Sequence, residues 1–192
     1  MIVAVLLSLV VVTAWEFLAA RYAPPPPAPK ALAAPTLPGA NAVQGVLHPR
    51  AQVVASAPRV SLETPMLSGS INLKGARIDD LILTHYQATT ERNSPDVELY
   101  SPEGSADAEY AGFGWAGPAG QVPDDNTVWQ AQGNKLTPDT PVTLRWTNAQ
   151  GWAFTIQFSI DKNYMITARQ SVSAPGFTPF AYVSRTNSKL DY

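Results

Sequence analysis

Acidic side chains are the residues of this 192-residue chain whose types and spacing are best suited to chemistry. Paired carboxylates can act as general acid and base or bind a hard cation such as Ca²⁺. Consecutive strand residues point to opposite faces, however, and the chain has no EF-hand spacing. We therefore expect solvated turns, and no metal, at all of these positions: the pair Asp79 and Asp80, and the stretch Asp96, Glu98, Glu103, Asp107 and Glu109.

Histidine and nucleophile chemistry is weakly represented. His85 closes the apolar run Leu81–Tyr86, and we interpret it as a packed or hydrogen-bonded sheet residue, because a general base needs a partner that positions it. His48 lies beside Pro49 and is assigned no role. The chain has no cysteine and no Gly-x-Ser-x-Gly motif. We predict no catalytic residue and no cofactor, and thus that the protein is not an enzyme.

A glycine motif invites comparison with nucleotide-binding loops. Gly112, Gly114 and Gly117 match the pattern G-x-G-x-x-G, in which a following helix directs its N-terminus at a pyrophosphate. Pro118 and Gly120 come directly afterwards and exclude that helix. We interpret the match as accidental, a glycine-rich strand end that places two aromatic residues in the core. The turn signal Asp124-Asp125-Asn126 follows Pro123.

Aromatic residues offer a further kind of binding site. Five tryptophans and seven tyrosines could form a surface on which sugars or peptides stack. Trp146, Trp152 and Phe154 fall on the apolar phase of their segments, so we assign them to the core. The remaining candidates for an exposed stacking surface are Tyr100, Tyr110 and Trp129.

The elements that must position these residues are β-strands, because the sequence from residue 59 onward follows a period of two. Apolar and polar residues alternate from Trp152 to Ile160, and the flanking segments Val142–Thr147 and Tyr164–Val172 complete a predicted antiparallel meander. Since no helical apolar period lasts beyond two turns, the predicted fold is all-β, an antiparallel β-sandwich. Earlier predicted strands are Val60–Thr64, Leu67–Leu73, Ile78–Tyr86, Val97–Ser101, Tyr110–Trp115 and Thr127–Gln132.

The chain before this domain divides into two parts. Residues 1–20 are apolar except for Ser8, Thr13 and Glu16, and about 20 residues match a bilayer core of ~30 Å. We predict a retained transmembrane anchor; a cleaved signal peptide is the alternative, although no Lys or Arg precedes the apolar run. Residues 21–58 are rich in Pro and Ala, which predicts a disordered linker, either a spacer or a tether whose sequence hardly matters.

Charge restricts the possible partners. The chain carries 13 basic and 15 acidic side chains, and the predicted domain at 59–192 holds ten of the former and fourteen of the latter. The domain is therefore formally −4, and the anchor with its linker is +2. A basic footprint for nucleic acid is absent, so we predict that the protein does not bind nucleic acid.

The order of segments along the chain resembles that of a known protein family. A hydrophobic segment and a Pro/Ala linker precede PRVSLETPMLSGSINLKGARIDDLILTHY (Pro58–Tyr86), GFGW (Gly112–Trp115) and PVTLRWTNAQGWAFTIQFSIDKNYMITARQSV (Pro141–Val172). This arrangement resembles the YidC-type membrane protein insertases. The stretch Ser68–Leu81 is similar to the start of that family's large periplasmic domain, and the resemblance covers nearly all of residues 59–192.

The resemblance implies a bacterial inner-membrane protein whose first transmembrane helix is at residues 1–20 and whose β domain lies in the periplasm, as part of a β-supersandwich. It implies an insertase and chaperone that assists the insertion and folding of inner-membrane proteins, alone or with the Sec translocase. The expected partners are Sec components, nascent membrane proteins and, through residues 1–20, the bilayer. In this family a downstream membrane core of five helices performs the insertion. We expect this chain to be an N-terminal fragment, the periplasmic portion without that core.

Two other functions remain open. The chain could be a membrane-anchored periplasmic β-sandwich that acts as a binding or scaffold module and is complete as it stands. It could also be a sugar-modifying enzyme, a reading suggested only by the epimerase-like shape of the implied fold. That chemistry would require a histidine and a carboxylate across a cleft, and His85 is the candidate histidine.

Overall fold

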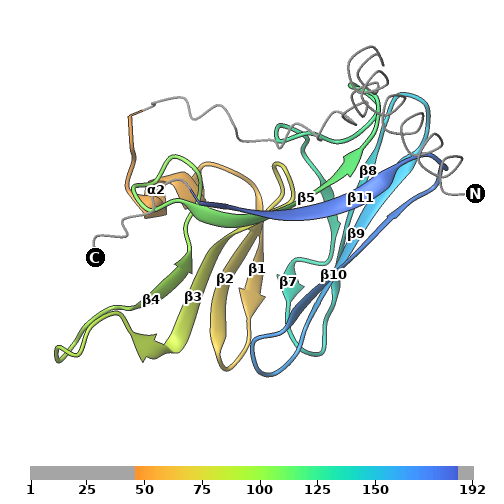
Figure 1. Cartoon of the computed structure of the whole chain (residues 1–192). Coiled ribbons are helices and arrows are strands. Elements are labelled where there is room, and N and C mark those ends of the chain that lie inside the picture. Colours follow the sequence, from red (N-terminus) through yellow and green to blue (C-terminus); the bar gives the residue numbers. More distant parts are fainter. Residues whose placement is uncertain (1–45, 186–192) are drawn as a thin grey trace, which may run out of the picture. The chain divides into compact units, whose positions relative to one another are not determined.

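The computed structural model describes residues 46–185. The predicted anchor at residues 1–20 and the linker up to residue 45 lie outside the described residues. Within residues 46–185, no helix has both the length and the apolar character needed to cross a membrane. The described part is built almost entirely from strands in two sheets (Figure 1).

The larger sheet has seven strands, in the order β11-β5-β3-β2-β1-β7, with β4 also paired to β3. Neighbouring strands are antiparallel except for β1 and β7, which run parallel. The strands are β1 (Arg59–Glu63), β2 (Leu67–Asn72), β3 (Arg77–Gln87), β4 (Asp96–Tyr100), β5 (Glu109–Ala116), β7 (Lys135–Leu136) and β11 (Thr178–Arg185).

The second sheet has four strands, in the order β10-β9-β8-β6. They are β6 (Gln130–Gln132), β8 (Val142–Thr147), β9 (Ala153–Ile160) and β10 (Ile166–Val172). The last three form the meander that the sequence predicts, with Leu144 opposite Ile156 and Ile156 opposite Gln170. In β9 every second residue from Phe154 to Ile160 is buried, which confirms the period-two pattern.

The core lies between the apolar faces of the two sheets. Trp115 of β5 stacks on Trp129 at 5.9 Å between ring centroids and meets Phe154 of β9 edge-on at 5.3 Å. Leu62 and Leu144 from the two sheets are wholly buried in the same cluster. Burial of large apolar side chains is the dominant stabilising contribution of such a core. The prediction of an all-β sandwich is therefore confirmed.

The aromatic candidates for a stacking surface do not form one. Tyr110 and Trp129 are 1% and 2% exposed, so the prediction that they lie on the surface is wrong. Tyr100 is half-buried against the core. Trp129 lies just before the short strand β6, where it faces Trp115 instead of solvent.

The glycine motif has a structural explanation in the pairing of β5 with β11. Gly114 lies opposite Phe180 and Gly112 opposite Tyr182. A Cβ atom on Gly112 would lie 2.4 Å from the Tyr182 ring, and one on Gly114 would lie 2.7 Å from the Phe180 ring. These glycines therefore leave room for the aromatic rings of the neighbouring strand to lie across them. The sequence predicts only a glycine-rich strand end that places aromatic residues in the core. The packing of these glycines against Phe180 and Tyr182 is not predicted, because β11 is not among the predicted strands.

A short helix precedes the sandwich. Helix α2 (Arg50–Ala55) lies within the range predicted as a disordered linker, so that prediction is wrong for these residues. None of its residues is buried. Six residues with no buried face give too weak an apolar signal to be predicted from the sequence, and the helix needs other contacts to hold it in place.

Candidate functional site

A β-bulge places both carboxylates of the acidic pair on one face of the larger sheet. Ser70 of β2 pairs with Asp80, but the next residue, Ile71, pairs with Ile78, so Asp79 has no opposite residue on β2. Such an insertion interrupts the alternation of faces along a strand. Asp79 and Asp80 are only 2% and 7% exposed. The prediction that they lie in a solvated turn is therefore wrong. The expectation that their side chains point to opposite faces of a strand is wrong as well.

Glycine at position 69 permits this arrangement. Gly69 pairs with Leu81 beside the bulge, and its φ is +156°. A Cβ atom at this position would lie 2.0 Å from the backbone oxygen of Asp80. Any side chain would push the two strands apart, because a backbone atom cannot rotate away.

Two arginines neutralise the acidic pair and connect it to helix α2. Arg59 donates to both carboxylate oxygens of Asp79, at 2.7 and 3.2 Å, and its Nε donates to the Val54 carbonyl of the helix at 2.8 Å. Arg50, the first residue of the helix, pairs with Asp80. We call this network the helix clamp; it comprises Arg50, Arg59, Ser70, Asn72, Asp79 and Asp80.

The remaining bonds of the helix clamp engage most of its buried polar atoms, although the Nε of Arg50 has no hydrogen-bond partner within the described residues. Arg59 donates to the Ser70 hydroxyl at 3.0 Å, and Ser70 in turn donates to Asp80. Asn72 donates to Asp79 at 3.0 Å. Buried carboxylates held by guanidinium groups and further hydrogen bonds are structural ion pairs. The acidic pair therefore holds a helix to a sheet, and each of its four carboxylate oxygens accepts at least one hydrogen bond.

A second arginine cluster lies at the start of β3, two residues before the acidic pair. Arg77 pairs with Glu103 at 2.6 Å and Asp125 at 2.9 Å, and its guanidinium lies 4.5 Å from the centroid of the Tyr110 ring. Burial acts to lower the pKa of Arg77, but the hydrogen bonds to Asp125 and Glu103 and the nearby Tyr110 outweigh it and raise this pKa. Burial, followed by the charge of Asp125, raises the pKa of Tyr182 to about 12.

The predicted turn after Pro123 is confirmed in part of its residues. The Asp124 carboxylate accepts the Asn126 N–H at 2.9 Å, as in an Asx turn. Asp125 instead points its carboxylate at Arg77, and the Tyr182 hydroxyl donates to it at 3.4 Å. The turn therefore also supplies the carboxylate that pairs with the buried side chain of Arg77.

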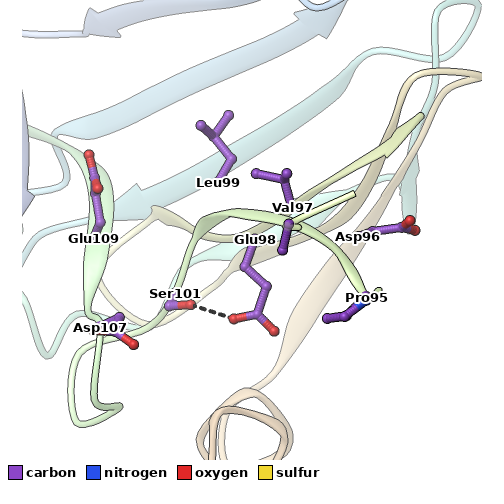
Figure 2. A pocket seen from close by; sticks show the side chains of 9 residues that line it. Pro95, Asp96, Val97, Glu98, Leu99, Ser101, Asp107 and Glu109 are labelled. Carbon is purple, nitrogen blue, oxygen red and sulfur yellow. Dashed lines mark hydrogen bonds between the residues drawn. The ribbon is translucent and has the colours of Figure 1, made fainter. Parts of the chain in front are cut away.

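A groove opens where one strand pairs with two others. β3 pairs with β4 through Leu81–Gln87 and with β5 at Ile78, so β4 and β5 diverge from the same edge. Ser101 and Glu109 bridge them where they meet. The space between has a volume of about 440 Å³ (Figure 2). We call it the fork groove; its lining is Ala88, Pro95, Asp96, Val97, Glu98, Leu99, Ser101, Asp107 and Glu109.

The fork groove combines acidic and apolar side chains. Two of its four carboxylates have cationic neighbours, since Glu98 lies 3.6 Å from Arg50 and Glu109 pairs with Arg185 at 2.7 Å. Figure 2 shows Glu98 bonded to Ser101 and the carboxyl groups of Asp96 and Asp107 directed away from one another. Among residues 46–185, no group of three or more histidines and acids is arranged to hold a metal ion. Chemically, the groove suits a basic or amphipathic peptide segment.

The predicted sheet histidine lies at the exposed end of β3. His85 shares a hydrogen bond of 3.1 Å with the hydroxyl of Thr84, in keeping with its interpretation as a hydrogen-bonded residue. Within the described residues, no carboxylate is bonded to His85, and it does not line the fork groove. The geometry required for a histidine-carboxylate pair is therefore not assembled around it.

The arginines are the site residues that sequence reasoning missed. In the sequence, Arg50, Arg59 and Arg77 belong to no motif and contribute only to the net charge. A signal was available, because Asp79 and Asp80 sit in the middle of an apolar strand pattern and a buried carboxylate requires a cation. The sequence does not say which cation, since the three arginines are spread over 28 positions.

Comparison with known proteins assigns a class to this fold. The family model of the YidC periplasmic domain matches residues 59–189. The matched range contains both sheets and all strands of the sandwich. The class is thus that of the periplasmic β-domains of membrane protein insertases.

Individual relatives give the same family. A protein of Nitrobacter hamburgensis named membrane protein insertase YidC is 46% identical over 145 residues, 71% of this chain. Proteins of the same name from Bradyrhizobium diazoefficiens and Zymomonas mobilis are 41% and 36% identical over 80% and 93% of this chain. This chain belongs to the YidC membrane protein insertase family. It spans 24%, 26% and 32% of the lengths of these three curated relatives.

Proposed function

We propose that this chain is the periplasmic portion of a membrane protein insertase and chaperone. In this role it assists the insertion and folding of bacterial inner-membrane proteins, alone or with the Sec translocase, while a membrane core performs the insertion itself. The match of residues 59–189 to the YidC periplasmic domain is the observation that carries the proposal. The name shared by the relatives supports it.

The proposed location is the inner membrane, with residues 1–20 as the anchor and the β domain in the periplasm. The domain names of the family support the periplasmic side, and the apolar composition of residues 1–20 supports the anchor. The function is non-catalytic in this proposal. Its support is that the acidic pair is engaged by Arg50 and Arg59, while His85 is bonded to a hydroxyl.

The helix clamp fixes the point at which the linker is attached to the β domain. The linker reaches the sandwich through α2, and Arg50 and Arg59 bind that helix to the sheet at two points. A fixed point of attachment restricts the directions in which a tethered domain can face. We propose that the clamp keeps the domain oriented toward its partners, which are Sec components and nascent membrane proteins.

A chimeric insertase tests this function. The region of the Nitrobacter hamburgensis relative that aligns with this chain is replaced by this chain, and Sec components are co-purified from cells that depend on the chimera. We expect the chimera to retain them and a variant lacking the region to lose them. Failure of a well-folded, membrane-located chimera to retain any Sec component would contradict the proposal.

The second candidate is a membrane-anchored β-sandwich that serves as a binding or scaffold module. The fork groove favours it, because four carboxylates around Val97 and Leu99 form a surface complementary to a basic segment. The chimera discriminates the two. A scaffold module would retain its own partner when the insertase core is inactivated. A part of the insertase would instead lose its partners when the core is inactivated.

A further inference from the structure

Three of the eight large apolar side chains exposed in the described residues lie together at one end of the sandwich. Tyr86 is the second-last residue of β3, and Tyr164 and Met165 lie in the turn between β9 and β10. The two tyrosine rings are 6.4 Å apart and tilted by 53°. We call Tyr86, Tyr164 and Met165 the tip patch; their exposures are 53%, 42% and 65%.

The turn that presents the tip patch is held by a single carboxylate. Oδ1 of Asp161 accepts the backbone N–H of Asn163 at 2.8 Å and of Met165 at 3.0 Å. The backbone N–H of Asp161 donates to the Met165 carbonyl at 3.0 Å. Tyr164 and Met165 are therefore displayed by an ordered turn, and their exposure is not the result of a frayed loop.

The three side chains of the tip patch are uncharged, and the turn that carries two of them has no net formal charge. Lys162 contributes one positive charge to the turn, and the one carboxylate, Asp161, is occupied by backbone donors. The hydrogen bond with Tyr86 and a smaller effect of desolvation raise the pKa of Tyr164, so its hydroxyl stays uncharged at neutral pH. Tyrosine, with an apolar ring and a polar hydroxyl, is enriched where hydrocarbon meets water.

The chain itself brings a bilayer within reach of the tip patch. Between residue 20 and the first described residue lie 25 residues, which span at most about 80–90 Å when fully extended. The 11 residues of β3 cover roughly 36 Å. The tether can therefore bring either end of the sandwich to the membrane in which residues 1–20 are anchored, and a weak contact is strengthened by the tether.

We propose that the tip patch docks on the lipid interface of the bilayer to which the domain is tethered. This inference rests on the proposed membrane anchor. Tyr86 and Tyr164 place their rings among the headgroups, and Met165 enters the edge of the acyl region. Because the patch is neutral, the contact is apolar and does not require anionic lipid.

A fluorescent label at the turn tests the proposal. The native chain has no cysteine, so Asn163→Cys gives one labelling site beside the patch in the full 192-residue chain. The matched control is Gln150→Cys, in the exposed turn at the other end of β9. Each chain is incorporated into phosphatidylcholine vesicles that contain a lipid-borne quencher, and incorporation is measured first by flotation.

We expect quenching and a blue shift for the label at position 163 and neither for the label at position 150. Adding Tyr164→Ser and Met165→Ser returns the first label to water, because each apolar side chain contributes about a tenfold change in the docking equilibrium. Phosphatidylglycerol and high salt leave the signal unchanged. A salt-sensitive signal overturns the apolar contact.

The other outcomes separate the two proposals. A chain that floats while the label at position 163 stays in water overturns the docking and leaves the anchor standing. A chain that does not float overturns both. Shielding that develops without lipid as protein concentration rises assigns the tip patch to a second copy of the chain and overturns the lipid contact.

Discussion

Replacing Arg59 with methionine tests whether the helix clamp is a structural ion pair. The side chains of Arg59 and Asp79 are 10% and 3% exposed, and Asp79 keeps only the Asn72 amide at 3.0 Å when the guanidinium is removed. Breaking a buried pair by removing one partner costs about 3–5 kcal/mol, because the other charge remains buried. The Val54 carbonyl also loses its donor.

The size of this loss is measurable by urea unfolding. Domains have a free energy of unfolding of about 5–15 kcal/mol, so Arg59→Met removes a large fraction of it. With a slope of roughly 2 kcal/mol per molar urea, the midpoint falls by about 1.5–2.5 M. The assay is tryptophan fluorescence of the full chain in detergent micelles, to which the buried pair Trp115 and Trp129 contributes along with the other three tryptophans.

The control is another arginine-carboxylate pair. Arg185 makes two bonds to Glu109, but its side chain is 56% exposed, so Arg185→Met costs at most about 1 kcal/mol. The double variant with Arg59→Met and Asp79→Leu removes the stranded charge and recovers part of the loss. Equal effects of Arg59→Met and Arg185→Met, or a loss below about 1 kcal/mol for Arg59→Met, would refute the reasoning.

Three further predictions concern the sandwich. Gly112→Ala places a Cβ 2.4 Å from the Tyr182 ring and lowers the free energy of unfolding by about 1–3 kcal/mol in the urea assay; an unchanged midpoint contradicts the close approach. Phe154→Ala empties a wholly buried site and costs about 3–5 kcal/mol, whereas Thr155→Ala on the other face costs under about 0.5 kcal/mol, and similar losses for both would argue against a core at β9. The pKa of Tyr182 rises from 10.0 to about 12 on folding, so stability is full below pH 10 and falls as pH rises from 10 to 12; Tyr182→Phe flattens this fall in unfolding curves taken across that range, and an identical pH dependence in the variant contradicts the shift.

The regular strands could be predicted from the sequence because their burial follows a period of two. The segment Trp152–Ile160 became β9, and its two neighbours became β8 and β10. Strand β11 was missed because its residues alternate less clearly, Pro179 breaks the propensity, and its inward side chains lie on glycines instead of in an apolar layer. Its position depends on a partner strand more than 60 residues away.

The site was harder to predict than the fold. The prediction for Asp79 and Asp80 assumed strict alternation, and a single unpaired residue at the bulge invalidated it. Tyr110 and Trp129 were misplaced for a similar reason, since both lie at the margins of strands, where local pattern gives little information on tertiary burial. Long-range ion pairs such as Arg50 with Asp80 leave no local trace in the sequence.

The pairing of β5 with β11 can form only after a delay during synthesis of the chain. Residues 109–116 leave the ribosome well before residues 178–185, and roughly 60 residues separate them, so at about 5–20 residues per second the edge of β5 waits some 3–12 s for its partner. During that interval its two glycines, Gly112 and Gly114, have no aromatic rings above them. An unpaired, glycine-rich edge is a weakly specified template for pairing with other chains, so we expect the risk of aggregation to be highest in this interval and to end when Phe180 and Tyr182 pair across the two glycines.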